Sequence, residues 1–360
     1  MTNQQHINFS NLSEAQRITV IQRLTALWAF CESGLGGILH ALQIPLTGFI
    51  VGGLAVIIIS FIAKVSAENY TTIFQSLVIV LMVKAMVSPY TPFPAYIAVS
   101  FQALMGYLLF RVFQVNRFSI FLLCTITMLE SAIQQLLILT LFFGQSFWKA
   151  TNELVNLISK QLGIITTNGN QKFIASYLLV YLAWGTLIAF IAARIIKSFF
   201  SDNKMNEFYS SFVFTPEFNL PEIPERKKMR NKLWMMIITM LVICGLLFLF
   251  AANVKKGWVE ILKTISWTIS AIMIWYMLIG PLFSKLVLKL LKKQESRYSE
   301  SIAGTLSFLP VLRKITVLAW QKTKPYKGFK RIHFFFSALL SWSLVYSDIP
   351  SGDPPFNNPQ

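Results

Sequence analysis

Charged residues are scarce in this sequence. They make up 13% of its 360 residues, about half the share of an ordinary soluble domain. The few charges stand mainly between long apolar runs, and 55% of all residues are hydrophobic. A charge at the centre of a membrane-spanning helix is costly, so insertion into a bilayer requires this distribution. The scarcity excludes an ordinary soluble domain and favours a membrane protein.

Cysteine and histidine are also rare. Cys31, Cys124 and Cys244 lie far apart within apolar runs, a spacing that provides neither a disulfide framework nor a zinc site. Three histidines are too few for a multi-histidine metal centre. The sequence contains no Walker A loop, HExxH, GxSxG or DDxxD motif. We therefore predict that the protein is not an enzyme and holds no metal or cofactor of its own.

Eight apolar stretches approach or exceed the length of about 20 residues that a bilayer core demands. They predict an all-α polytopic membrane helix bundle with about eight transmembrane helices. A further helix over Ser13–Arg23, with Ser13 as its N-cap, is expected to lie in the membrane interface. The predicted spans are Leu24–Gln43, Leu46–Ala63, Thr72–Ser88, Phe93–Phe113, Phe118–Phe143, Phe173–Phe199, Leu233–Ala252 and Ile265–Leu290.

Basic residues indicate the orientation of these spans. The turns Gln43–Pro45 and Pro89–Pro94 contain no Lys or Arg, whereas Arg111 and Arg117 separate the fourth span from the fifth. The positive-inside rule then places both termini in the cytoplasm of a bacterial cell, with the protein in the inner membrane. Two lysines, Lys255 and Lys256, contradict this orientation, because it places them outside. The lysines of the long loop after the fifth span contradict it more mildly. The net charge of +17 is explained by this orientation and by anionic lipids rather than by a nucleic-acid partner.

A long polar segment divides the chain. Residues 201–232 carry three prolines and many charges and are predicted to be a cytoplasmic linker. Residues 1–200 form a six-span unit, and residues 233–292 form a two-span unit. Residues 293–360 are predicted to be a cytoplasmic tail with interfacial helices over Ile302–Trp320 and His333–Tyr346 and a disordered Pro-rich end.

Several polar side chains interrupt the apolar runs, and such residues are candidates for function because the bilayer makes them expensive. None occupies the predicted cytoplasmic half of a span apart from its extreme end, which suggests a polar recess open to the outside. Lys84 is the first candidate to bind a solute, and it is expected to pair with Glu32 or Glu130. The alternative is a set of structural bonds between helices. The candidate substrate-binding residues are Lys84, Glu130, Glu32, His40, Gln102 and Gln134.

Small residues recur every four positions on the first span: Ala29, Ser33, Gly37 and Ala41. Such a stripe allows another helix to approach closely. It predicts a docking face for a separate membrane protein, although a neighbouring helix of the same chain explains the pattern equally simply.

The first 200 residues resemble the substrate-binding S components of energy-coupling factor (ECF) vitamin transporters. The resemblance lies in six spans, the small-residue stripe and the stretch Glu32–Gly53 (ESGLGGILHALQIPLTGFIVGG). It implies a transmembrane coupling protein and cytoplasmic ATPases as partners, with Ala29, Ser33 and Gly37 at the contact. The two extra spans and the tail depart from that family, and the chain has no Ala-Arg-Gly coupling motif.

Three functions follow as alternatives. The first is a subunit that binds a small polar molecule from outside and depends on a partner for energy. The second is an autonomous secondary transporter in which Glu32 or Glu130 carries protons, although no inverted repeat is evident. The third is a membrane scaffold that does not transport.

Overall fold

A computed structural model describes residues 13–35, 47–88, 91, 93–163, 168–201 and 265–345, apart from 269, 272–273 and 276–278. All regular elements in this part of the chain are helices, and it contains no strand. The elements are α1 (Glu14–Phe30), η1 (Cys31–Leu35), α3 (Thr47–Val65), α4 (Thr71–Val87), α5 (Phe93–Phe113), α6 (Arg117–Phe143), α7 (Gln145–Gln161), α8 (Gly169–Ser201), α12 (Gly280–Lys322) and α13 (Gly328–Val345).

The all-helical, multi-pass membrane class is supported by five helices that are long and apolar enough to cross a bilayer. Helix α4 is apolar but shorter. The observed bounds of α3, α4, α5, α6 and α8 agree with the predicted spans to within four residues. The predicted span Leu233–Ala252 lies outside the described residues, so the total of eight remains a prediction. The five candidate segments are Gly48–Val65, Phe93–Phe113, Arg117–Phe143, Gly169–Lys197 and Ser296–Lys322.

Helix α1 begins where the sequence predicts. Ser13 is its N-cap: the Ser13 hydroxyl accepts a hydrogen bond from the Gln16 amide, and the Gln16 side chain accepts one from the Ser13 amide. Such a capping box satisfies amides that the first turn leaves unpaired. The predicted interfacial helix Ser13–Arg23 and the beginning of the first span form one helix, since α1 continues unbroken through Arg23 to Phe30; the interfacial position stays a prediction. The predicted end of this span at Gln43 lies outside the described residues.

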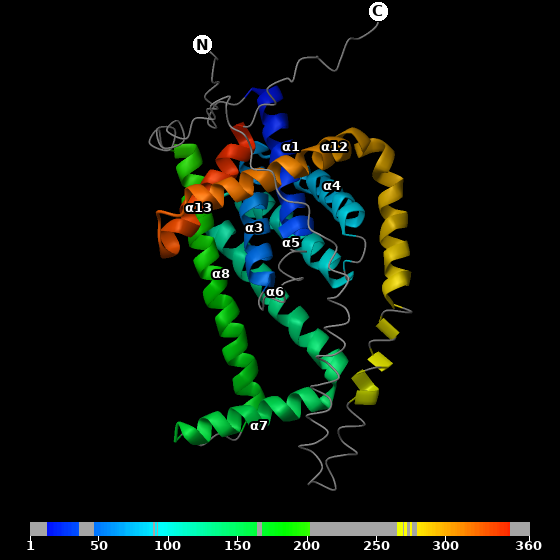
Figure 1. The fold of residues 1–360 in the computed structure, drawn as a ribbon, viewed down its shortest axis with the longest axis vertical. Coiled ribbons are helices and arrows are strands. Elements are labelled where there is room, and N and C mark those ends of the chain that lie inside the picture. The colour runs from blue at the N-terminus through cyan, green and yellow to red at the C-terminus, as the bar shows by residue number, and fades with distance from the viewer. Residues whose placement is uncertain are drawn as a thin grey trace, which may run out of the picture.

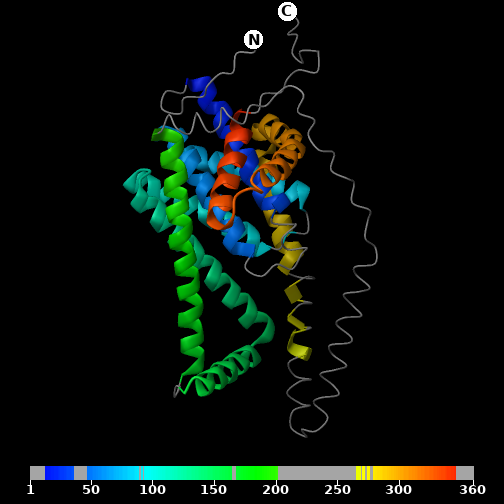
Figure 2. The same ribbon diagram turned by 60° about the vertical axis from the view of Figure 1, so that its left-hand side comes forward.

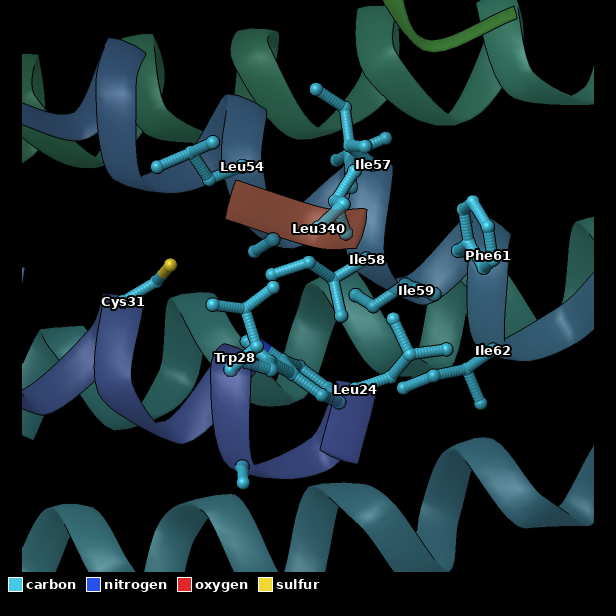
Figure 3. Close-up of a cluster of buried hydrophobic side chains, with 14 of the residues drawn as sticks. Leu24, Trp28, Cys31, Leu54, Ile57, Ile58, Ile59, Phe61, Ile62 and Leu340 are labelled. Carbon is cyan, nitrogen blue, oxygen red and sulfur yellow. The ribbon is translucent and has the colours of Figure 1, made fainter. Parts of the chain in front are cut away.

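The core forms where α1 crosses α3 and α4. Figure 3 shows Leu24, Trp28 and Ile58 packed together, with Leu340 of α13 beside them. Trp28 and Ile59 are completely buried. Close packing of this kind, rather than the hydrophobic effect, holds helices together in lipid, because lipid tails are as apolar as leucine.

Helices α12 and α13 pack onto this core rather than standing apart from it. The buried cluster joins residues of α1, α3 and α4 to Leu312, Ile315 and Leu340. In Figures 1 and 2 the latter part of α12 (orange) turns across one end of the bundle, roughly perpendicular to α8. The segment Ser296–Lys322 is long and apolar enough to span a bilayer, so the interfacial position of Ile302–Trp320 stays a prediction. The predicted linker beyond Ser201 and the disordered end, Asp348–Gln360, lie outside the described residues.

Helix α7 was not predicted; the sequence indicated only a long loop. It lies at the opposite end of the molecule from α12, across the ends of α6 and α8 (Figures 1 and 2). Its turn from α6 uses Gly144 at a φ of +58°, a conformation that favours glycine. Thr151 is buried against α8, where its hydroxyl donates to Asn170 Oδ1 at 2.9 Å. Leu154, Leu157 and Ile158 form an exposed apolar face.

Candidate functional site

Glu32 and Lys84 form a buried ion pair between the start of η1 and the last turn of α4. Lys84 Nζ donates to Glu32 Oε2 at 2.7 Å, and each side chain is 4% exposed. The prediction that Lys84 pairs with Glu32 or Glu130 is thus resolved in favour of Glu32. Two buried charges are stable only when they neutralise each other. The pair therefore ties α1 to α4, which favours the structural alternative over solute binding at Lys84.

Glu32 stands in a π-helical segment, Cys31–Leu35, that follows directly on α1. A π-helix has more residues per turn than an α-helix, so the side chains of this segment point in directions that differ from those of a continued α-helix. Beside the ion pair, the Ser88 hydroxyl donates to the Ser33 carbonyl at 3.3 Å. Short π-helical segments occur frequently at functional sites, and here the segment brings a carboxylate to the Lys84 ammonium.

Gln102 lies apart from the ion pair, against α3. Its side chain is 3% exposed, and its Nε2 lies 3.4 Å from where a Cβ on Gly52 would stand. Met128 of α6 approaches the same glycine at 3.3 Å. Gly52 thus leaves room for both side chains. Gln102 Oε1 is buried and has no hydrogen-bond partner within the described part of the protein.

Glu130 and Gln134 are one turn apart on the same face of α6. Gln134 Nε2 donates to the Pro94 carbonyl at 2.9 Å, which joins α6 to the first turn of α5. Glu130 has no such bond: its Oε2 is buried without a hydrogen-bond partner among the described residues. The described structure does not pair Glu130 with Lys84. A carboxylate oxygen that is removed from water and unpaired is costly, so this group requires a donor from elsewhere.

The small-residue stripe is not an exposed face where the structure describes it. Ala29 is fully buried and Ser33 is 4% exposed, both covered by helices of the same chain. These two positions offer no exposed surface to a separate protein within this structure, and docking along the stripe stays a prediction. Gly37, Ala41 and His40 lie outside the described residues.

Sequence reasoning did not single out the Thr25–Ser76 contact. The Thr25 hydroxyl donates to Ser76 Oγ at 2.8 Å in the interior, between α1 and α4. Hydroxyl residues are common in apolar helices, so only the helix pairing reveals this bond. No cluster of His, Cys, Asp and Glu suited to a metal occurs among the described residues.

Comparisons with known proteins provide no relative from which the role of this site could be inferred. No family model, curated protein or solved structure matches this chain.

Proposed function

We propose that this protein is a solute-uptake subunit of the bacterial inner membrane that binds a small polar molecule from the outer side. Glu130 is the central binding residue of this proposal, with Gln134 beside it. Binding alone moves nothing across the membrane, so energy comes from a partner. The Glu32–Lys84 pair serves as a structural element that fixes the helices around the site.

The observation that carries this proposal is the unpaired Glu130 oxygen within α6, a helix able to span a bilayer. Ionisable residues inside spans are rare, because each must be solvated or paired there. A carboxylate accepts hydrogen bonds and attracts positive charge. The fitting ligand class is therefore a small molecule that carries an amine or several hydroxyl donors.

Untargeted mass spectrometry of the purified full-length protein tests this site. We expect a small molecule to accompany the wild type and to be reduced at least about tenfold by Glu130→Gln, because a charge-assisted hydrogen bond is lost. Glu153→Gln is the matched control, since Glu153 is exposed on α7. Equal recovery of every small molecule from the two variants would refute solute binding at Glu130.

An autonomous secondary transporter is the second candidate, and the same unpaired carboxylate favours it. A buried carboxyl that gains and loses a proton is a common element of proton-driven carriers. Uptake by the protein alone in proteoliposomes with an imposed pH gradient would select this candidate. Dependence on co-purifying ATPases would select the uptake subunit and would support the S-component relationship that the sequence suggests. An assembly that moves no solute would identify a scaffold.

The proposed orientation has both termini in the cytoplasm and α7 on the outer surface. The positively charged connections between spans support the first point. The amphipathic character of α7 supports the second, since its apolar face is exposed at the ends of α6 and α8. A helix of this kind lies in the plane of the interface with its apolar face in lipid.

Cysteine labelling in intact cells tests the orientation and the lipid contact together. In a background without native cysteines, we expect Asn156→Cys to react with an impermeant maleimide and Leu157→Cys to react at least about tenfold more slowly, since lipid covers the latter. Both positions are exposed in the protein itself, so only the membrane distinguishes them. If Asn156→Cys reacts only in inverted vesicles, α7 lies on the cytoplasmic side and the proposed orientation is wrong. If both cysteines react equally fast, lipid does not cover the apolar face of α7.

A further inference from the structure

A cavity of about 640 Å³ lies at the end of the bundle across which α12 passes. Three parts of the chain form its wall: the first turns of α1, the connection between α3 and α4 with the start of α4, and the middle of α12. Its volume falls within the range of cavities that hold small ligands. It is distinct from the Glu130 site, since neither Glu130 nor Gln134 lines it.

The wall of the cavity is rich in hydrogen-bonding side chains. Thr72 and Gln75 contribute from α4, and Tyr298, Ser301 and Thr305 contribute from α12. Isoleucine side chains of α1 and α4 add apolar surface, alongside further polar side chains of α1, of α4 and of the α3–α4 connection. A site whose wall combines polar and apolar groups fits an amphiphilic ligand or a hydrated small ion.

Arg17 is the one cation among the lining residues. Its Nε atom is buried and has no hydrogen-bond partner within the described residues. Glu14 is the one acidic lining residue; it is exposed, and the described structure contains no ion pair between it and Arg17. A guanidinium presents several donors in a planar fork, which suits phosphate and carboxylate groups. The unpaired Nε therefore points to an anionic ligand.

Two further features favour negative charge at this place. Arg297 lies over the ring of Tyr298, its Cζ 5.6 Å from the ring centroid, which brings a second cation close to the cavity wall. Helix α4 begins at Thr71, so the positive end of its dipole is near Thr72 and Gln75. The Glu14 carboxylate is the opposing group, and it lies in the first turn of α1, where the helix's own dipole compensates it.

We propose that this cavity binds a phosphate group, held by Arg17 and enclosed by α12. The phosphate comes either from a phospholipid headgroup at the membrane surface or from a soluble phosphate compound. Because residues of α12 form part of the wall, occupation of the cavity stabilises the packing of α12 against α1 and α4.

Thermal unfolding of the full-length protein in a zwitterionic detergent tests the proposal with three probes: inorganic phosphate, dihexanoyl phosphatidylglycerol and dihexanoyl phosphatidylcholine. We expect saturable stabilisation by at least one probe and at least about tenfold weaker binding of that probe by Arg17→Gln, because a charge-assisted bond is removed. Arg117→Gln is the control, since Arg117 is exposed and outside the cavity. Stabilisation by inorganic phosphate identifies a soluble ligand, and stabilisation by a lipid alone identifies a headgroup.

Ser301→Trp provides a second variant that keeps Arg17 and fills the cavity from α12. We expect it to abolish saturable stabilisation as well. If Arg17→Gln does not fold, the binding of the probe by Ser301→Trp tests whether the cavity is the binding site. The proposal is overturned if no probe saturates, or if the variant that folds binds the probe as tightly as Arg117→Gln does.

Discussion

Replacement of Lys84 by methionine is expected to destabilise the protein by about 3–5 kcal/mol, because it leaves the Glu32 carboxylate buried and unpaired. Lys84 Nζ lies 2.7 Å from Glu32 Oε2, and the ammonium of Lys84 is the partner that neutralises that carboxylate. Methionine keeps the apolar stem of lysine and removes only the charge. The measurement is thermal unfolding in detergent, together with the folded fraction recovered on size-exclusion chromatography.

A double variant separates the ion pair from simple loss of packing. Glu32→Leu combined with Lys84→Met removes both charges, and we expect it to recover most of the lost stability, since apolar residues of similar volume often replace a buried pair without cost. Lys197→Met is the control, because Lys197 is exposed on α8. If Lys84→Met unfolds at the same temperature as Lys197→Met, the pair does not stabilise the bundle.

Replacement of Gly106 by leucine is expected to cost about 3 kcal/mol, since it forces α5 away from α3. Even a Cβ at this position would stand 2.7 Å from Ile59 Cγ2. Ile59 is fully buried, as is Leu123 on the other side of the glycine. Neither side chain has room to move, so the added atoms overpack the interface. Unfolding in detergent, compared with the wild type, measures the effect.

Gly304 is the matched control for this substitution. It also lies within a helix, but beyond that helix's own nearby backbone no atom of the described residues stands within 4 Å of where its Cβ would be. Gly304→Leu is expected to be neutral or to stabilise by up to about 1 kcal/mol, because leucine favours a helix more than glycine does. Equal stability of the two leucine variants would contradict the close packing of α3 against α5.

These two expectations bear on function through the geometry around α6. The ion pair and the Gly106 contact hold α4 and α5 in place, and α5 supplies the Pro94 carbonyl that Gln134 binds. Glu130 is left with an oxygen that this framework does not satisfy. If Glu130 binds a solute as proposed, a variant that loosens the framework is expected to reduce binding indirectly, whereas Glu130→Gln is expected to reduce it in a protein of unchanged stability.

The sequence by itself determined the class of protein and most helix bounds. Long apolar runs with basic residues at one end defined α3, α5 and α6 closely, because the cost of burying charge in lipid acts on each segment independently of its neighbours. The N-cap at Ser13 was predictable as well, because capping depends only on residues that are neighbours in the sequence. The amphipathic helix α7 stands where the sequence predicted a loop, although Leu154, Leu157 and Ile158, at three- and four-residue spacing, carried the signal.

Only the tertiary structure decided which polar residues meet. Lys84 had two possible partners in the sequence, Glu32 and Glu130, and the choice of Glu32 followed from the packing of α1 against α4 and from the π-helical turn at Cys31–Leu35. The Arg17 cavity joins α1 to side chains of α12 that are far away along the chain. Contacts of this kind depend on the relative positions of helices, and no local pattern of residues encodes those positions.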